Sequence, residues 1–267
     1  MMPFIEHRGS GRSDHDADDM TANWDREWSE SGGGRITEDH ESWRQMRRFL
    51  PKNGSVLEAG CGLAKWVEFL NKQGFKARGI DFSAVAIQKS RELWPGIELV
   101  QGDLRRMPFE TGRFQAVVSF GAVEHDSAGP DEALREMQRV LEPGGIMYCS
   151  VPCMNTLRRC GTLALKDWLV CSKTVRRLAG RKPEVSFYEF VFTPEEYARI
   201  LAAAGFEVLS MLPCSPRLDF LEPREGSFGH RTLRRIAARF PWLAAHMVAA
   251  ICRKPDRRRG AVGPTGV

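Results

Sequence analysis

A glycine-containing turn in the stretch SVLEAGCGLAKW is the first feature of the sequence that could bind a ligand. Gly60 and Gly62 follow a short apolar run and precede a helical pattern. The dinucleotide fingerprint G-x-G-x-x-G has a third glycine, but here that position is Lys65, and the small residue Ala64 comes one position earlier. A P-loop is excluded because no Gly-Lys-Ser/Thr follows. The turn predicts a ligand other than a dinucleotide; the alternative is a helix-opening turn that binds nothing.

Carboxylates end three successive predicted strands, at Glu58, Asp81 and Asp103. Ligands of parallel sheets bind beyond the carboxyl ends of the strands, so we expect all three acids at one site. Glu58 would repel a pyrophosphate but attract an ammonium or sulfonium group. Asp81 stands where an acid accepts the hydroxyls of a ribose, or else caps the helix that begins near Ser83. Asp103 could accept a hydrogen bond from an adenine amine. A ligand with a cationic amino-acid end, a ribose and an adenine is S-adenosylmethionine (SAM).

Two further residues that could do chemistry, Glu124 and His125, follow the fourth predicted strand. We predict that both face the methyl group of the ligand and are the catalytic residues. His125 titrates near neutral pH and could act as a general base; the alternative is that it shapes the loop or contacts the cofactor. No metal site is predicted, because the chain has no C-x-x-C pair. Asp126 and Asp131 are interpreted as loop and cap residues.

Short apolar runs alternating with helical patterns must position these residues. The predicted strands are residues 55–59, 76–81, 97–101, 116–120 and 145–151, and the helices between them are 66–73, 84–93 and 131–141. This alternation predicts a parallel sheet with right-handed crossovers and helices on both faces. Further predicted elements are an amphipathic helix at 37–50, a helix capped by Thr193 and Glu196, and strands at 206–212 and 246–253.

Taken in order, these segments resemble the class I, Rossmann-like SAM-dependent methyltransferases, in the group that acts on small molecules. VLEAGCGLA is similar to the first motif of that family, GIDFS to the second and GDLRRMPF to the third. FQAVVSFGAVEHD is similar to the fourth-strand motif, and LREMQRVLEPGGIMYCSVP to the stretch that follows it. Ala64 departs from the family, which often has glycine there. The resemblance implies an α/β fold with a Rossmann-like seven-stranded sheet, mostly parallel with an antiparallel last strand.

The resemblance also implies a role for each loop. Glu58, Gly60 and Gly62 hold the methionine part of SAM, Asp81 holds the ribose, and Asp103 with Leu104 holds the adenine. The predicted cofactor-binding residues are Glu58, Ala59, Gly60, Cys61, Gly62, Asp81, Phe82, Ser83, Asp103, Leu104, Phe120 and Gly121.

Outside the motifs, the sequence divides into a flexible segment at 1–35, a methyltransferase domain at 36–255 and a basic disordered tail at 256–267. Lid insertions are predicted at about 153–190 and 213–241. Aromatic residues in or beside the first insertion favour an aromatic or lipid-like acceptor, with an ordinary strand and core as the alternative; they are Trp168, Phe187, Tyr188, Phe190 and Phe192.

The composition of the chain favours one cellular compartment and one redox state of its cysteines. The chain has a net charge of +5 and seven cysteines at irregular spacing, which we predict to be free thiols. No signal peptide and no run of ~20 apolar residues is found, so we predict a cytoplasmic protein without a transmembrane segment, with peripheral membrane contact through its arginines left open.

We therefore predict a SAM-dependent methyltransferase for a small organic acceptor, methylated at oxygen or carbon. An RNA-directed methyltransferase is an alternative suggested by the basic tail, although nucleic acid is the less favoured partner. A SAM-binding protein without catalytic activity is the other alternative. The sequence does not set the oligomeric state.

Overall fold

The computed structural model describes residues 4–9, 17–32, 34–155, 185–216 and 239–256. Its strands are β1 (Phe4–Gly9), β2 (Ser55–Ala59), β3 (Lys76–Asp81), β4 (Glu98–Gln101), β5 (Phe114–Phe120), β6 (Leu141–Pro152), β7 (Val185–Val191), β8 (Glu207–Pro216) and β9 (Ala245–Arg253). Its helices are α1 (Ala17–Glu30), α2 (Glu41–Met46), α3 (Lys65–Lys72), α4 (Ala84–Leu93), the 3-10 helix η1 (Val123–His125), α5 (Asp131–Val140), α9 (Pro194–Ala203) and α11 (Pro241–Ala244).

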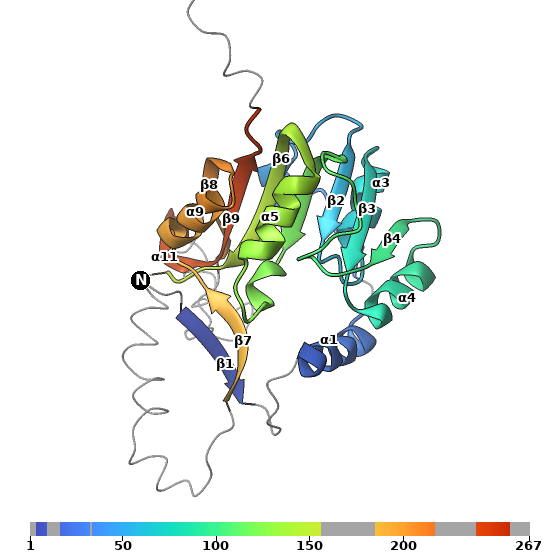
Figure 1. Ribbon diagram of the computed structural model, residues 1–267, viewed down its shortest axis with the longest axis horizontal. Helices are drawn as coiled ribbons and strands as arrows, with labels where there is room; N and C mark the ends of the chain where they lie inside the picture. The colour runs from blue at the N-terminus through green and yellow to red at the C-terminus, as the bar shows by residue number, and fades with distance from the viewer. Residues whose placement is uncertain (1–3, 10–16, 33, 156–184, 217–238, 257–267) are drawn as a thin grey trace, which may run out of the picture.

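A seven-stranded sheet in the order β4-β3-β2-β5-β6-β9-β8 forms the centre of the molecule (Figure 1). Neighbouring strands pair in parallel from β4 to β6, whereas β9 is antiparallel to both β6 and β8. The predicted Rossmann-like sheet with an antiparallel last strand is therefore confirmed. Strands β1 and β7 pair in a separate two-stranded antiparallel sheet.

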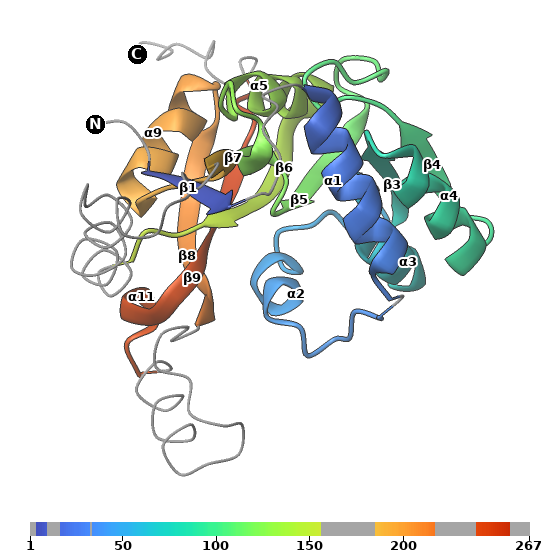
Figure 2. The ribbon, with the colours of Figure 1, turned by 90° about the horizontal axis from the view of Figure 1, so that it is seen from below.

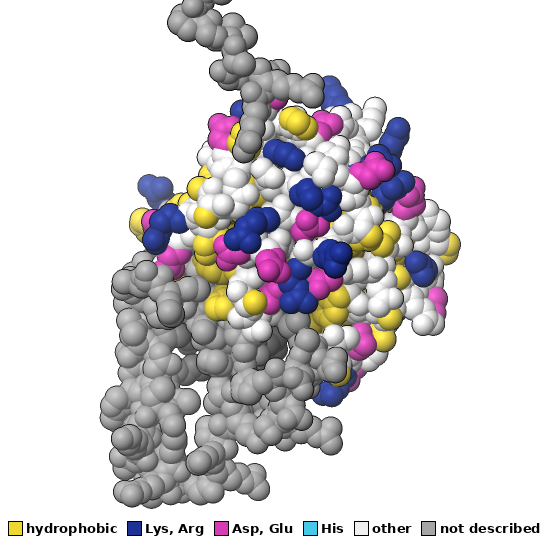
Figure 3. Space-filling model, viewed as in Figure 1, with side chains coloured by type: hydrophobic (Ala, Val, Ile, Leu, Met, Phe, Trp, Pro, Cys, Tyr) yellow, Lys and Arg dark blue, Asp and Glu magenta, His cyan; other side chains and the backbone are white. Residues whose placement is uncertain are grey.

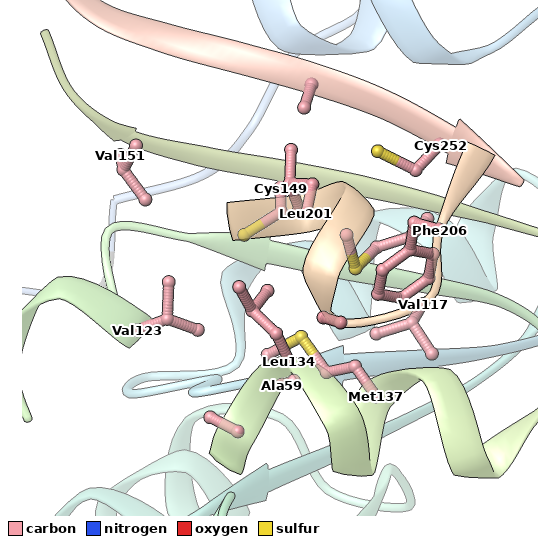
Figure 4. Close-up of a cluster of buried hydrophobic side chains, with 14 of the residues drawn as sticks. Ala59, Val117, Val123, Leu134, Met137, Cys149, Val151, Leu201, Phe206 and Cys252 are labelled. Atoms are coloured by element: carbon pink, nitrogen blue, oxygen red, sulfur yellow. The ribbon is translucent and has the colours of Figure 1, made fainter. Parts of the chain in front are cut away.

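Helices cover both faces of the large sheet, which is why its strands are apolar on both sides. Successive side chains of a strand point to opposite faces, so Leu57 of β2 packs in a core with α5 and α9, while Val56 packs in a second core with α2 and α3. Figure 4 shows Leu134 and Met137 of α5 in the first of these cores. The sheet is thus held rigid from both sides, and its strand ends have fixed positions.

Two elements of the structure lie within the N-terminal segment that the sequence analysis predicts to be flexible. Residues 1–35 contain β1 and α1, and α1 packs against α4 (Figure 2). The predicted helix at 37–50 is shorter in the structure, where α2 spans Glu41–Met46. His40 caps that helix by accepting a hydrogen bond from the backbone N–H of Ser42, so the helix cannot begin at residue 37.

The predicted lids lie largely outside the described residues, as does most of the predicted basic tail. Of the aromatic residues assigned to the acceptor wall, Phe190 and Phe192 are buried in the core beside α9, so for these two the core interpretation applies. Five cysteines of the described residues are free thiols and all are buried. None of the described helices has both the length and the apolar character needed to cross a membrane.

Helix α9 begins with the predicted capping box. The hydroxyl of Thr193 accepts a hydrogen bond from the backbone N–H of Glu196, and the Glu196 carboxylate accepts one from the backbone N–H of Thr193. Tyr197 and Leu201 on the same helix are fully buried in the core. The cap therefore stabilises a helix that belongs to the cooperative unit of the fold.

We predict that Thr193→Ala lowers the free energy of unfolding by about 1 kcal/mol, because it removes the cap acceptor. Thr193→Ser is the matched control; it keeps the hydroxyl and should stay within a few tenths of a kcal/mol of the wild type. Urea unfolding followed by circular dichroism measures both. Equal losses in the two variants would contradict this role of the hydroxyl.

Candidate active site

A cavity of about 290 Å³ opens at the carboxyl ends of the parallel strands. Loops after β2, β3, β4 and β5 line it, and α1, which lies beside α4 in Figure 2, adds Thr21, Trp24 and Trp28 to the lining. Its lining residues are Thr21, Trp24, Trp28, Gly60, Asp81, Phe82, Asp103, Leu104, Arg105, Gly121, Ala122, Val123, His125, Asp126 and Ala133. The volume is near the lower end of the range typical of small-molecule sites.

The glycine turn after β2 needs glycine for two separate reasons. Gly60 and Gly62 have φ values of +75° and +47°, a region that other residues rarely adopt. A Cβ on Gly60 would lie 2.4 Å from the Cβ of Ala122, and a Cβ on Gly62 would lie 2.7 Å from the ring of Trp28. At Gly62 the close neighbour is therefore a side chain of α1.

Glu58 is buried behind the turn and does not line the cavity. Its carboxylate accepts a hydrogen bond from the backbone N–H of Val67 at 3.0 Å. This interaction caps α3, whose N-cap residue Ala64 has no side chain that could do so. Burial raises the pKa of Glu58 well above its usual value, and the nearby Asp81 raises it further.

Asp81 lines the cavity at the end of β3 and joins two loops. One carboxylate oxygen accepts a hydrogen bond from the backbone N–H of Gly62 at 2.8 Å, and the other accepts one from Ser83 at 2.9 Å. Burial raises the pKa of Asp81, although these two hydrogen bonds oppose the shift. The side chain of Ser83 caps α4 through the backbone N–H of Ala86, so Asp81 is not needed as that cap.

Asp103 lines the cavity after β4, and its carboxylate is held by Arg105. The guanidinium donates from Nε at 2.9 Å and from an Nη atom at 2.7 Å to the same carboxylate oxygen, and the backbone N–H of Arg105 donates to the other oxygen. The Arg105 side chain thereby lowers the pKa of Asp103. An adenine amine would therefore meet an acid that is already ionised and oriented.

Helix α1 forms a wall of the cavity that the sequence analysis did not predict. Trp24 and Trp28 stack with their ring centres 5.5 Å apart, and Trp24 meets the ring of His125 edge-on at 4.8 Å. The hydroxyl of Ser83 donates a hydrogen bond to Asp25. The spacing of Trp24 and Trp28, one helical turn apart, is the signal in the sequence that could have identified this wall.

Lys89 on α4 holds the C-terminal end of α1. Its ammonium group donates to the backbone carbonyls of Trp28, Ser29 and Ser31, at distances of 2.8 to 3.0 Å. These carbonyls lie at the end of a helix, where acceptors lack intrahelical partners and a positive charge is favourable.

The predicted catalytic pair lies on η1, directly after β5. His125 lines the cavity, whereas Glu124 is buried beside it and is only 1% exposed. Burial raises the pKa of Glu124 to about 8, with a smaller contribution from Glu189. In the described part of the chain, Oε2 of Glu124 accepts no hydrogen bond.

Part of the chain that forms this site is similar to a known protein family. Residues 56–145 match the family described as "Methyltransferase domain". A demethylmenaquinone methyltransferase from Staphylococcus saprophyticus is 34% identical over 145 residues, which cover 48% of this chain and 60% of that enzyme. Residues 56–145 are therefore similar in sequence to methyltransferase domains.

Two further comparisons cover more of the chain. A 2-phytyl-1,4-naphtoquinone methyltransferase from Thermosynechococcus vestitus is 29% identical, over 65% of this chain and 83% of that enzyme. The structure of a SAM-dependent methyltransferase from Mesorhizobium loti aligns with a TM-score of 0.55 and 18% identity, over 81% of this chain and 99% of the other. The latter comparison supports the fold.

The cavity brings together six of the predicted cofactor-binding residues: Gly60, Asp81, Phe82, Asp103, Leu104 and Gly121. The other six do not line it: Glu58, Ala59, Cys61, Gly62, Ser83 and Phe120. Phe120 differs most from its prediction, because its ring stacks on Trp66 at 4.5 Å in the core. Gly62 is covered by Trp28.

SAM, the cofactor of this family, fits the groups that line the cavity. Asp81 offers carboxylate oxygens that could accept hydrogen bonds from ribose hydroxyls. Leu104, Val123 and Ala133 offer apolar surface for an adenine. Trp24 offers an aromatic ring, and such rings attract cations like a sulfonium.

Lys89→Met should loosen α1, because it removes three hydrogen bonds to the end of that helix while keeping an unbranched apolar chain. We expect the local opening free energy of residues 17–30 to fall by about 1–2 kcal/mol, which is roughly a five- to thirty-fold faster amide exchange. Hydrogen–deuterium exchange mass spectrometry measures this. Lys72→Met, at the exposed end of α3, is the control and should leave amide exchange of residues 17–30 unchanged.

Proposed function

We propose that the protein transfers the methyl group of SAM to a small organic acceptor, at an oxygen or carbon atom. The observation that carries the proposal is that one cavity is bounded by Asp81 at the end of β3 and by His125 after β5. A cofactor whose ribose lies against Asp81 can direct its sulfonium toward His125 and α1. The space between the cofactor and these groups is then the place of the acceptor.

Within this proposal, different residues of the cavity contact different parts of the cofactor. Asp81 accepts hydrogen bonds from the ribose hydroxyls, with the lone pairs not used by Gly62 and Ser83. Asp103 and Leu104 contact the adenine. Glu58 does not contact the cofactor. Its role is to hold the glycine turn after β2, and the methionine part of SAM lies beside that turn.

The chemical step makes few demands on the protein. When bound, SAM supplies a methyl group on a positively charged sulfur that is a good leaving group. The chain must place the acceptor in line with that methyl group and exclude water. As the acceptor atom bonds to the methyl carbon, the S–CH₃ bond breaks and its electron pair stays on sulfur. The proton displaced from the acceptor must also be removed, and His125 is the polar side chain best placed to act on the acceptor.

A flat aromatic acceptor is favoured by the wall that α1 provides. Trp24 lies at the cavity between Trp28 and His125, and its ring can stack on or meet edge-on a planar substrate. The relatives from Staphylococcus saprophyticus and Thermosynechococcus vestitus are named for methylation of demethylmenaquinone and 2-phytyl-1,4-naphtoquinone. We therefore propose a reduced quinone or a related hydroxylated aromatic ring as the class of acceptor.

Nucleic acid remains the less favoured acceptor. Lys and Arg side chains alternate with Asp and Glu over the face that carries α5, without a continuous basic surface (Figure 3). Electrostatic recognition of a phosphate backbone relies on such a surface.

Asp81→Asn should weaken SAM binding by about tenfold or more. A neutral amide is a weaker hydrogen-bond acceptor than a carboxylate, and its NH₂ group would face the backbone N–H of Gly62 or of Ser83, so that two donors would meet. Isothermal titration calorimetry with SAM and with S-adenosylhomocysteine measures the change. Asp131→Asn, at the start of α5, is the control and should bind both compounds like the wild type. If Asp81→Asn also keeps wild-type affinity, the assignment of the ribose to Asp81 is wrong.

His125→Ala should reduce kcat by about 10²-fold or more while SAM affinity changes little, because the side chain acts on the acceptor rather than on the cofactor. Turnover can be followed as S-adenosylhomocysteine released in the presence of reduced naphthoquinones. His125→Gln fills similar space without a titratable nitrogen and should lose as much. Full activity in His125→Gln would mean that the side chain only shapes the loop.

A further inference from the structure

Three side chains that can bind a metal ion meet beside the cavity. Glu124 and His125 lie on η1, and Glu189 lies on β7, which packs beside η1. Ligand atoms of the three residues all lie within 4.8 Å of one another. Nε2 of His125 is 4.0 Å from Oε1 of Glu124. The fold therefore adds a second carboxylate, from a distant part of the sequence, to the pair that the sequence analysis singled out.

One oxygen of the buried Glu124 carboxylate has no hydrogen-bond partner among the described residues. Its side chain is 1% exposed, and among the described residues Oε2 accepts no hydrogen bond. A buried carboxyl group either stays protonated or, when ionised, is stabilised by hydrogen bonds, by an opposite charge or by a metal ion, because an isolated carboxylate is costly to desolvate. An unpartnered buried oxygen beside an imidazole and a second carboxylate points to a cation.

We propose that Glu124, His125 and Glu189 together bind one divalent transition-metal ion. One nitrogen and two carboxylate ligands suit Zn²⁺ or Mn²⁺, since imidazole favours the former and carboxylates the latter. Ligand atoms at about 2.1 Å from an ion lie roughly 3.0–3.5 Å apart, so the side chains must approach one another by about 1 Å on binding. This assignment replaces the prediction that the chain has no metal site.

The position of the ion suggests what it does. Three protein ligands leave a coordination position open, as in catalytic zinc sites, and His125 borders the cavity. For its catalytic part this inference rests on the proposed function: the open position binds a hydroxyl oxygen of the acceptor. The ion lowers the pKa of that hydroxyl, and the proton passes to water. The oxygen, or a ring carbon that it activates, then attacks the methyl group. His125 is in this case a metal ligand rather than a general base.

The test measures metal binding directly and separately from activity. Untagged full-length protein is treated with EDTA, exchanged into metal-free buffer and titrated with ZnCl₂, MnCl₂ or MgCl₂ in a calorimeter, and bound metal is counted by mass spectrometry. We expect one Zn²⁺ or Mn²⁺ per chain. The dissociation constant should rise about 10- to 100-fold or more in Glu124→Gln and in Glu189→Gln. Glu195→Gln, an exposed residue of α9, is the matched control and should bind metal like the wild type.

The results of the metal titration either support or overturn the proposed metal site. The inference is overturned if the wild type shows no saturable binding of Zn²⁺ or Mn²⁺, or if both variants bind like the control. Should Glu124→Gln fail to fold, Glu189→Gln alone decides, because Glu189 is only half-buried. SAM binding and methyl transfer in the presence of EDTA are measured on the same preparations. Turnover that persists without metal leaves the proposed function standing while removing the catalytic role of the ion.

Discussion

The hydrogen bonds of Asp81 fix the relative positions of two loops on which the rest of the site depends. Its carboxylate ties the glycine turn after β2 to the start of α4 after β3, through the backbone N–H groups of Gly62 and Ser83. Both bonds are charge-assisted and buried, which makes them stronger than ordinary ones. Glu58 fixes the other side of the turn by capping α3. The turn is therefore shaped by the protein's own acids before any ligand arrives.

Keeping two acids next to one small turn has an electrostatic consequence. Burial raises the pKa of both Glu58 and Asp81, and the nearby Asp81 raises the pKa of Glu58 further. A phosphate at this place would put negative charge beside two acids in a region of low dielectric, whereas a cationic ligand would favour the ionised forms of both acids. The proposed preference for a sulfonium cofactor over a dinucleotide thus rests on the same carboxylates that shape the loop. It does not require direct contact between Glu58 and the cofactor.

Much of this could be predicted from the sequence, because it depends on local signals. The bounds of β3 and α4 follow from short apolar runs and from Ser83 as a cap, and the capping box of α9 is visible in Thr193 to Glu196. What could not be predicted depends on contacts between distant segments. Trp28 covers Gly62 while Lys89 and other contacts hold α1 on α4, and Glu189 comes close to Glu124 through the packing of β7 beside η1. No local sequence pattern predicts that Trp28 contacts Gly62 or that Glu189 lies near Glu124.

Helix α1 contacts both of the loops that Asp81 joins, since Trp28 lies on Gly62 and Asp25 accepts a hydrogen bond from Ser83. A ligand in the cavity gains contact with Trp24 only while α1 is docked. Docking of the helix and binding of the ligand are therefore thermodynamically linked, and each must strengthen the other by the same factor. The N-terminal segment, which lies outside the motifs quoted from the sequence, supplies Thr21, Trp24 and Trp28 to the cavity, so a ligand bound against these residues would depend on the interactions that hold α1 on α4.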